Sequence, residues 1–242
     1  MDIEVSNLSK TYITVKALRS VSLSVDRGES VGLVGANGAG KTTLLHILMG
    51  FLPFDEGSVK ILDKPSARLD AATKERIGFV AEETGLLPWA TLMDMAELYK
   101  NLYPTWDEDM LDRFIDEWDI VTDKRMRSMS KGQKRLAELA LCFSCNPEIL
   151  VLDEPFVGLD AVMRFSVLSA MKTLNAQQRT TIFYSSHILS DIEKIAKRVI
   201  FIRGGKISLD EQIASLKSSV EETFIQNYGI SADGLIDAGG SR

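Results

Sequence analysis

The chain has 242 residues, of which 45% are hydrophobic and 26% charged, a balance typical of a globular protein with a sizeable buried core. Acidic side chains outnumber basic ones by 34 to 28, and the net charge of −6 disfavours nucleic acid as a partner, because nucleic-acid-binding faces are strongly basic. The first residues hold no basic-then-apolar leader, and no run of about 18 apolar residues occurs, so we expect neither a secretory signal nor a membrane span.

The first third of the chain is predicted to form strands separated by tight turns. The expected strands cover residues 2–12, 17–25, 29–35, 57–63 and 76–82. Alternation of apolar and polar residues over 21–25 indicates an antiparallel edge strand with one solvated face. Residues 41–49, which follow a short apolar strand ending in glycine, have helical character.

Helical periodicity replaces the strand pattern between Gly85 and Pro147. Helices are expected over residues 91–103, 107–120 and 130–145. Cys142 and Cys145 form one CxxC inside the third of these helices, with no second CxxC and no His cluster to complete a metal site. We therefore expect unmodified core thiols and a cytosolic protein.

After Pro147 the chain alternates strands and helices again. A strand is expected over 148–155, a helix over 161–175, a strand over 180–186, a helix over 188–197 and a hairpin over 198–210. This order predicts an α/β core formed by residues 1–84 and 148–215, interrupted by a helical subdomain over 85–147. Residues 216–242 are predicted to be a C-terminal tail with weak helical character.

A glycine-rich loop follows the short apolar strand. Its sequence from Gly35 to Thr42, GANGAGKT, satisfies the phosphate-loop pattern G-x-x-x-x-G-K-[ST] between a strand and a helix. The glycines let successive backbone N–H groups converge on a phosphate, and the helix directs its positive end at the same anion. Lys41 is expected to reach the β- and γ-phosphates, and Thr42 to ligate Mg²⁺. The expected nucleotide contacts are Gly35, Asn37, Gly38, Ala39, Gly40, Lys41, Thr42 and Thr43.

Two adjacent carboxylates, Asp153 and Glu154, follow the apolar residues of ILVLDEP. In a protein with a phosphate loop, the acid that ends such a strand holds Mg²⁺, often through a water, and that role suits Asp153. Glu154 is expected on the opposite side of the strand's pleat, where it could act as general base for a water that attacks the γ-phosphate. An isolated pair of this kind would more often be a solvated strand end. Beside a phosphate loop, it predicts hydrolysis of ATP with Mg²⁺ as cofactor.

The stretch from Met129 to Gln133, MSKGQ, combines a helix start with positive charge. Ser130 and Gln133 have the spacing of a capping box, and a helix start that presents free N–H groups is itself an anion site. The cations around it are Lys124, Arg125, Arg127, Lys131, Lys134 and Arg135. Such a cluster is either a solvated face or an attraction for a nucleotide, and the sequence leaves both alternatives open.

The phosphate loop, the acidic pair and the stretch from Ser130 to Gln133, about twenty residues before that pair, together resemble the ATP-binding-cassette (ABC) family. The resemblance covers about residues 1–215, and its motif style is closest to bacterial exporter-type cassettes of drug or antibiotic efflux. It implies a fold of the α/β class: a P-loop NTPase core, with a RecA-like mixed sheet and an antiparallel β subdomain, interrupted by a helical subdomain. It also implies an ATPase that converts ATP and water into ADP and phosphate.

The resemblance assigns roles to single residues. Tyr12 matches the aromatic residue that stacks on adenine, Glu82 takes the place of the usual Gln near Mg²⁺, and His187 matches the histidine that contacts the γ-phosphate. The implied catalytic residues are Glu154, His187 and Lys41, the implied metal ligands are Thr42, Glu82 and Asp153, and the implied contacts to ATP on another subunit are Ser130, Lys131, Gly132 and Gln133. A plain strand aromatic at Tyr12 and a boundary histidine at His187 are the alternatives.

Two residues depart from the family's usual pattern. Glu82 adds negative charge near the phosphates, so turnover and its coupling to transport are expected to differ from the usual pattern. Lys131 replaces the first glycine of the signature, which keeps the backbone N–H and adds a cation. Gly158-Leu159-Asp160 resembles the loop that contacts the partner subunit.

Family members pair head to tail, so the resemblance implies a dimer with itself or with a paralogous ATPase subunit, in which each signature closes the ATP of the other chain. It also implies a separately encoded transmembrane permease, docked near Leu86, Leu87 and Trp89, and a location on the inner face of the cell membrane. Two alternatives stay open: an ATPase that serves a scaffold such as one for iron–sulfur cluster assembly, and a regulatory module that binds ATP with little hydrolysis.

Overall fold

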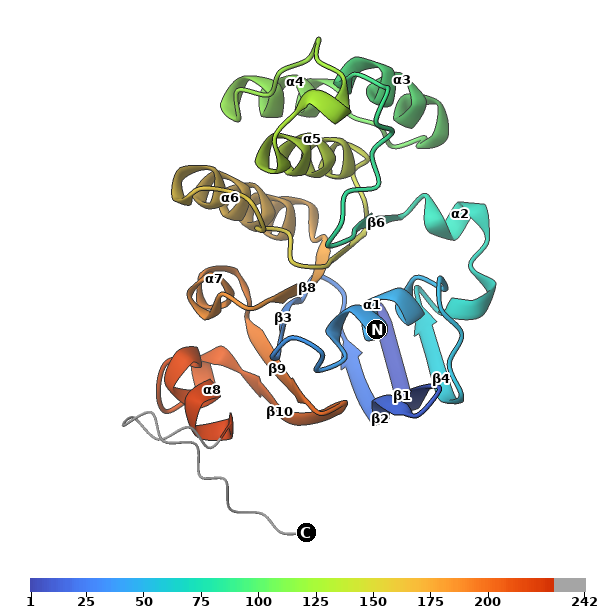
Figure 1. Ribbon diagram of the computed structural model, residues 1–242, viewed down its shortest axis with the longest axis vertical. Coiled ribbons are helices and arrows are strands. Elements are labelled where there is room, and N and C mark those ends of the chain that lie inside the picture. Colours follow the sequence, from blue (N-terminus) through green and yellow to red (C-terminus); the bar gives the residue numbers. More distant parts are fainter. Residues whose placement is uncertain (229–242) are drawn as a thin grey trace.

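An antiparallel sheet occupies the start of the chain. The computed structural model describes residues 1–228, and in it the strands pair in the order β2-β1-β4-β5 (Figure 1). Their bounds are Ile3–Tyr12 for β1, Val15–Val25 for β2, Glu56–Ile61 for β4 and Lys64–Pro65 for β5. Val21, Leu23 and Val25 of β2 are buried while the serines between them are more exposed, so β2 is the half-solvated edge strand that the alternation predicted.

A second sheet has the order β10-β9-β3-β8-β7-β6, and its neighbouring strands are parallel except for the pair of β9 with β10. The bounds are Ser30–Val34 for β3, Ile77–Val80 for β6, Ile149–Leu152 for β7, Thr181–Ser186 for β8, Arg198–Arg203 for β9 and Lys206–Gln212 for β10. In the β3–β8 register Val34 lies opposite Ser186, and in the β7–β8 register Leu152 lies opposite Tyr184. The segments that follow β3, β7 and β8 therefore leave the sheet at one edge.

Helix α1 (Lys41–Leu48) lies between the two sheets (Figure 1). Leu44, Leu45, Ile47 and Leu48 are each 0% exposed, and they join both sheets in one apolar cluster. A helix that is apolar around most of its circumference belongs in such an interior. Because α1 directly follows the phosphate loop, this burial also fixes the position of the helix start at which the loop ends.

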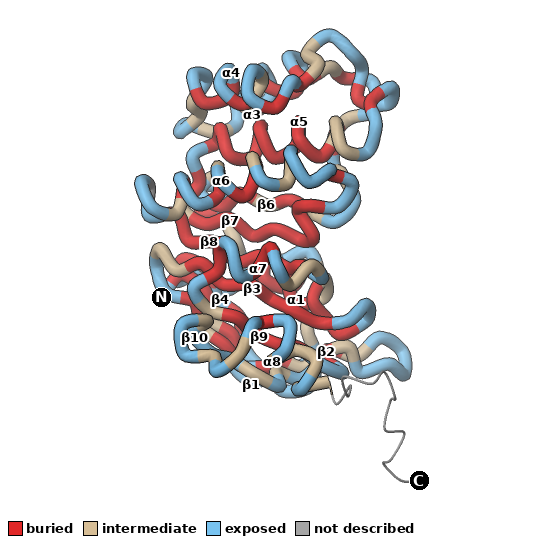
Figure 2. The backbone as a smooth tube through the Cα atoms, turned by 90° about the vertical axis from the view of Figure 1, so that its left-hand side faces the viewer, coloured by how far each residue is buried: buried red, intermediate tan, exposed pale blue. Residues whose placement is uncertain are grey.

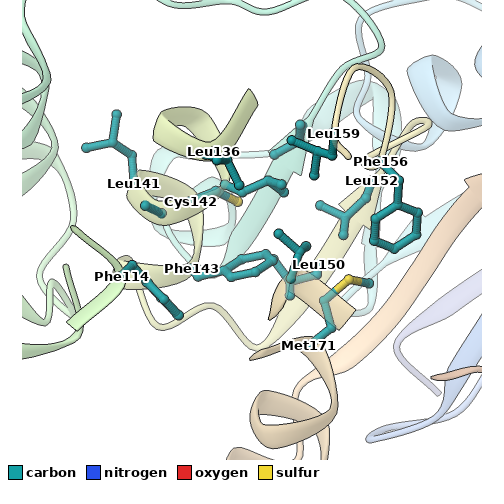
Figure 3. Packing of buried hydrophobic residues seen from close by; sticks show 14 of the residues in the cluster. Phe114, Leu136, Leu141, Cys142, Phe143, Leu150, Leu152, Phe156, Leu159 and Met171 are labelled. Atoms are coloured by element: carbon teal, nitrogen blue, oxygen red, sulfur yellow. The ribbon is translucent and has the colours of Figure 1, made fainter. Parts of the chain in front are cut away.

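The helices α3 (Leu92–Leu102), α4 (Glu108–Glu117) and α5 (Lys131–Ser144) lie at one end of the molecule, with α6 (Ala161–Gln178) next to α5 (Figures 1 and 2). Cys142 and Phe143 of α5 pack with Leu150 of β7 and Met171 of α6 in one buried cluster (Figure 3). The helical region therefore shares its core with the parallel sheet, and α5 packs against the strand that precedes the acidic pair.

Three further helices are α2 (Ala71–Lys74), α7 (Leu189–Ile195) and α8 (Val220–Tyr228). Of the predicted tail over 216–242, residues 216–228 include α8, whose Val220 is 0% exposed, and residues 229–242 lie outside the described residues. Within residues 1–228, no helix combines the length and apolar character that crossing a membrane requires.

Cys142 and Cys145 are buried and unpaired, as the sequence predicted. Burial raises the pKa of Cys142 well above its usual value and that of Cys145 to about 12, so both are neutral thiols at physiological pH.

Candidate functional site

A cleft of about 870 Å³ opens at the edge of the parallel sheet where the segments after β3, β7 and β8 emerge. Among the residues that the sequence singled out, the cleft brings together Asn37, Gly38, Ala39, Gly40, Lys41, Thr42, Thr43, Glu82, Glu154 and His187. The rest of its wall consists of Val15, Lys16, Ala17, Arg19, Val157 and Gly204. Gly35, Asp153, Tyr12 and the stretch 130–133 are not part of this wall.

The phosphate loop has the conformation that its glycines allow. Gly38 and Gly40 have φ angles of +77° and +112°, which residues with a side chain rarely adopt. A Cβ on Gly40 would also lie 2.7 Å from the carbonyl oxygen of Ala17. Gly40 is the N-cap of α1 and offers no side-chain cap, so the first N–H groups of the helix stay available to an anion in the cleft.

Lys41 is buried, at 7% exposure, and its ammonium group points back along the loop. Its Nζ donates to the carbonyl oxygen of Gly35 at 2.8 Å and lies 3.6 Å from Oε1 of Glu154. The amine is therefore held at the base of the cleft by one carbonyl and one carboxylate, contacts that phosphate oxygens can replace.

Glu154 lies beyond the end of β7, with a φ of +49°. Its own N–H donates to Ser185 Oγ at 2.9 Å, and its Oε2 accepts from the N–H of His187 at 3.2 Å and lies 2.7 Å from His187 Nδ1. The expectation that Glu154 sits across the strand's pleat from Asp153 is wrong. Pleat alternation stops where the strand ends at Leu152, and the left-handed turn instead aims the carboxylate into the cleft.

Asp153 is 0% exposed and sits behind the cleft wall. Its Oδ1 accepts from Ser185 Oγ at 2.5 Å, and within residues 1–228 its Oδ2 has no hydrogen-bond partner. A buried carboxylate oxygen without a partner calls for a cation or a bridging water. The unpaired oxygen fits the Mg²⁺ role that the sequence gave to Asp153, and Thr42, another expected ligand, lines the cleft.

No group of three or more His, Cys, Asp or Glu side chains able to hold a metal ion occurs among the described residues. Mg²⁺ that is bound with a nucleotide usually takes one or two carboxylates and completes its shell with phosphate oxygens and waters.

Glu82 lines the cleft from the segment that follows β6, and α5 holds the backbone of that segment. Arg135 donates to the carbonyl oxygens of Ala81, at 2.7 Å, and of Glu82, while Glu138 Oε1 accepts from the N–H of Gly85 at 2.9 Å. Arg135 and Glu138 are 2% and 7% exposed and pair at 3.1 Å. The sequence placed Arg135 only in a charged cluster and did not single out Glu138. Opposite charges three residues apart in an apolar helix could have predicted a buried ion pair.

The signature stretch lies outside the chain's own cleft, at the start of α5. Ser130 Oγ accepts from the N–H of Gln133 at 3.2 Å, and Gln133 Oε1 accepts from the N–H of Ser130 at 3.0 Å, so the capping box is confirmed. A Cβ on Gly132 would lie 2.6 Å from the carbonyl oxygen of Gly158. The helix start therefore packs closely on the loop that follows the acidic pair.

The hairpin of β1 and β2 contributes two cations that sequence reasoning missed. Lys16 and Arg19 line the cleft, and their strand pairs with β1 such that Thr11 lies opposite Lys16. Two basic residues on the strand that pairs with the strand of Tyr12 could have predicted further cations near the nucleotide. Tyr12 itself is 43% exposed at the end of the hairpin, with the Lys10 ammonium 5.6 Å from its ring centroid. Its stacking on adenine stays a prediction.

The chain is similar to known proteins over most of its length. The family model described as "ABC transporter" matches residues 18–157. The chain is 30% identical to the ABC transporter ATP-binding protein YtrB of Bacillus subtilis, over 89% of this chain and 73% of that protein. It is 29% identical to the linearmycin resistance ATP-binding protein LnrL of the same organism, over 85% of this chain and 67% of LnrL.

A plant relative and one solved structure extend the comparison. The chain is 31% identical to the sulfate/thiosulfate import ATP-binding protein of Cucumis sativus, over 86% of this chain and 61% of that protein. A solved structure titled as the ATP binding subunit of an ABC transporter superposes with a TM-score of 0.82 at 25% identity, over 94% of this chain and 99% of the other.

Proposed function

Because this chain belongs to the ABC transporter family as an ATP-binding, ATP-hydrolysing subunit, we propose that it works as one half of a head-to-tail pair that drives a separate transmembrane protein. The observation that carries the ATP-hydrolysing part of this proposal is a cluster of three side chains at the carboxyl end of the parallel sheet, Lys41, Glu154 and His187. The Lys41 ammonium lies 3.6 Å from the Glu154 carboxylate, which lies 2.7 Å from the His187 ring. These groups converge where the phosphates of ATP would reach the start of α1.

Each group has a role that its position supports. Lys41 and the free N–H groups at the start of α1 bind the β- and γ-phosphates, which displaces the Lys41 ammonium from Gly35 and Glu154. Glu154 then accepts a proton from the water that attacks the γ-phosphorus, and phosphate and ADP leave. His187 holds the Glu154 carboxylate through two contacts. Thr42, Asp153 and Glu82 are proposed to hold Mg²⁺, which would neutralise charge on the phosphates.

The test of this site is Glu154→Gln. The amide keeps the shape of the carboxylate, and its oxygen can still accept from the N–H of His187, but it cannot take up the proton of the attacking water, so we expect turnover of MgATP to fall by about 100-fold or more while ATP binding remains. Glu211→Gln on the exposed strand β10 is the matched control and is expected to keep wild-type turnover. Wild-type hydrolysis by Glu154→Gln would remove Glu154 from the role of general base.

The head-to-tail pair is supported by where the signature lies. Ser130, Lys131, Gly132 and Gln133 form a helix start outside the cleft that holds their own chain's Lys41. The capping box satisfies two groups of this helix end, and the remaining N–H groups and the exposed Lys131 are available to another anion. We therefore assign this helix start to the ATP held by the second subunit, which is either another copy of this chain or a paralogue.

A transmembrane permease is the proposed second partner, and its docking would place this chain at the inner face of the cell membrane. We also propose that the chain divides into a core over 1–84 and 148–215 and a helical subdomain over 85–147. A permease docked beside Glu82, where the core meets the helical subdomain, would couple the movements of these two parts. We propose export as the direction of transport. The motif style and the name of LnrL support it, whereas the plant relative is named for import.

A further inference from the structure

The C-terminal helix α8 reaches the phosphate loop through its last residue. The hydroxyl of Tyr228 accepts from the N–H of Ala36 at 3.1 Å and donates to the carbonyl oxygen of Ile202 at 3.0 Å. One hydroxyl thus bridges the phosphate loop and the end of β9, and it uses both its donor and an acceptor site to do so. The phosphate-loop pattern over residues 35–42 does not predict this contact, because Tyr228 is distant from it in the sequence.

Two side chains hold the ring of Tyr228. It packs against Phe224 of the same helix, with ring centroids 4.2 Å apart, and the Arg203 guanidinium lies 5.1 Å from its centroid. Arg203 also donates to the carbonyl oxygen of Asn227 at 2.9 Å, and Phe224 packs edge-on against Phe201 of β9 at 5.4 Å. The hydroxyl therefore has a fixed position relative to β9.

The phosphate loop depends on β9 and the turn after it for its support. A Cβ on Gly35 would lie 2.5 Å from the carbonyl oxygen of Ile202, and the N–H of Gly205 donates to the carbonyl oxygen of Ala39 at 3.1 Å. Tyr228 adds the contact to Ala36, between these two points. Because Lys41 donates to the carbonyl oxygen of Gly35, a shift of residues 35 and 36 would also move the Lys41 ammonium.

We propose that Tyr228 is a positioning residue for the nucleotide site. Through its hydroxyl, α8 stabilises the phosphate loop in its phosphate-binding conformation. The inference rests on the proposed nucleotide site and adds a device that sets its affinity for ATP. A factor that draws α8 away from β9 would lower that affinity without touching the cleft.

The decisive variant is Tyr228→Phe, which removes the hydroxyl and keeps the ring between Phe224 and Arg203. MgATP is the probe. We expect Kd and KM for MgATP to rise about five-fold, the change that the loss of a hydrogen bond of ordinary strength produces, with kcat within about two-fold of wild type. The midpoint of thermal unfolding is expected to fall by only about 2–4 °C, and amide exchange at Ala36 to accelerate.

The matched control is Asn227→Ala on the same helix. It removes the contact of Asn227 with the Ser208 hydroxyl, at 2.7 Å, and leaves the Tyr228 hydroxyl on Ala36, so KM for MgATP is expected to stay at the wild-type value. An unchanged KM in Tyr228→Phe, or an equal rise in Asn227→Ala, overturns the inference. A wild-type protein that fails to bind MgATP would instead overturn the proposed nucleotide site, so the two failures are distinguishable.

Discussion

Arg135 and Glu138 connect the signature helix to the segment that carries Glu82. Both side chains are nearly fully buried, and between them they bond to backbone groups of Ala81, Glu82 and Gly85. Burial lowers the pKa of Arg135 and raises the pKa of Glu138, and the opposite charge of each partner counteracts part of this effect. The pair contributes to the geometry of this junction more than to net stability.

Replacement of either partner tests this view. Arg135→Ala leaves the Glu138 carboxylate buried without its cation and two carbonyl oxygens without a donor, so we expect a loss of about 3 kcal/mol in the free energy of unfolding, measured by urea titration. Glu138→Gln keeps one acceptor oxygen, which can serve the N–H of Gly85, and it leaves Arg135 without a carboxylate but still bonded to the carbonyl oxygens of Ala81 and Glu82, so we expect a smaller loss. Equal destabilisation by both variants would contradict the asymmetry.

The same pair predicts a pH dependence. Because the folded-state pKa of Glu138 is raised above its unfolded value, its contribution to stability is fully present below that unfolded value, near 4.5, and is lost as the pH rises through the folded-state pKa. Glu138→Gln should therefore gain stability relative to wild type as the pH increases from about 4 towards 7. Urea titrations of both proteins across this range measure the difference, and a constant difference would count against it.

At the scale of elements, the segment from Leu86 through α3 presents the surface proposed for the permease. The sequence placed Leu86 at the docking surface, which requires an exposed side chain, and this is wrong: Leu86 is 8% exposed and belongs to the core, while Leu87 is half-buried. Trp89 is 64% exposed, and Met93 of α3 is 47% exposed. Large apolar side chains gathered at the surface mark an interaction site when they lie close together.

Trp89→Ala combined with Met93→Ala tests this surface. We expect copurification of the membrane partner to fall at least about ten-fold, because exposed aromatic and methionine side chains supply much of the binding energy at interfaces. MgATP hydrolysis by the separate subunit should stay at the wild-type rate. Phe165→Ala, at a residue 68% exposed on α6, is the control, and undiminished copurification of the double variant would exclude this surface.

At the scale of the whole molecule, a site shared between two chains predicts rescue by mixing. A Lys41→Ala chain lacks the proposed phosphate contact, and a Ser130→Glu chain places a carboxylate at the helix start that we propose faces the other chain's ATP. Each variant alone is expected to be inactive. In an equal mixture, half of the pairs hold one complete site, so hydrolysis should return to about a quarter of the wild-type rate.

The control for this experiment mixes Lys41→Ala with Glu154→Gln. Both changes damage the half-site formed by the cleft of their own chain, so neither site of the mixed pair is complete and no rescue is expected. Rescue in this control, or none in the first mixture, would contradict a site shared in trans.

The amino-acid sequence by itself determined the parts of this protein that local spacing encodes. The phosphate-loop pattern between strand and helix, the apolar strand before Asp153 and Glu154, and the capping box of Ser130 and Gln133 each depend on residues a few positions apart, and the structure contains the strands, helices and cap that they predicted. The roles of these residues in binding and hydrolysis stay predictions for the experiments above.

The tertiary structure alone decided which distant groups meet. The left-handed turn at Glu154 follows from where β7 ends, and it directs the carboxylate to Lys41 and His187. Arg135 reaches a backbone 54 residues away, and Tyr228 reaches Ala36 across 192 residues. Such contacts have no local sequence pattern, because they exist only after the sheets and helices have packed and brought the ends of separate elements to one edge of the sheet.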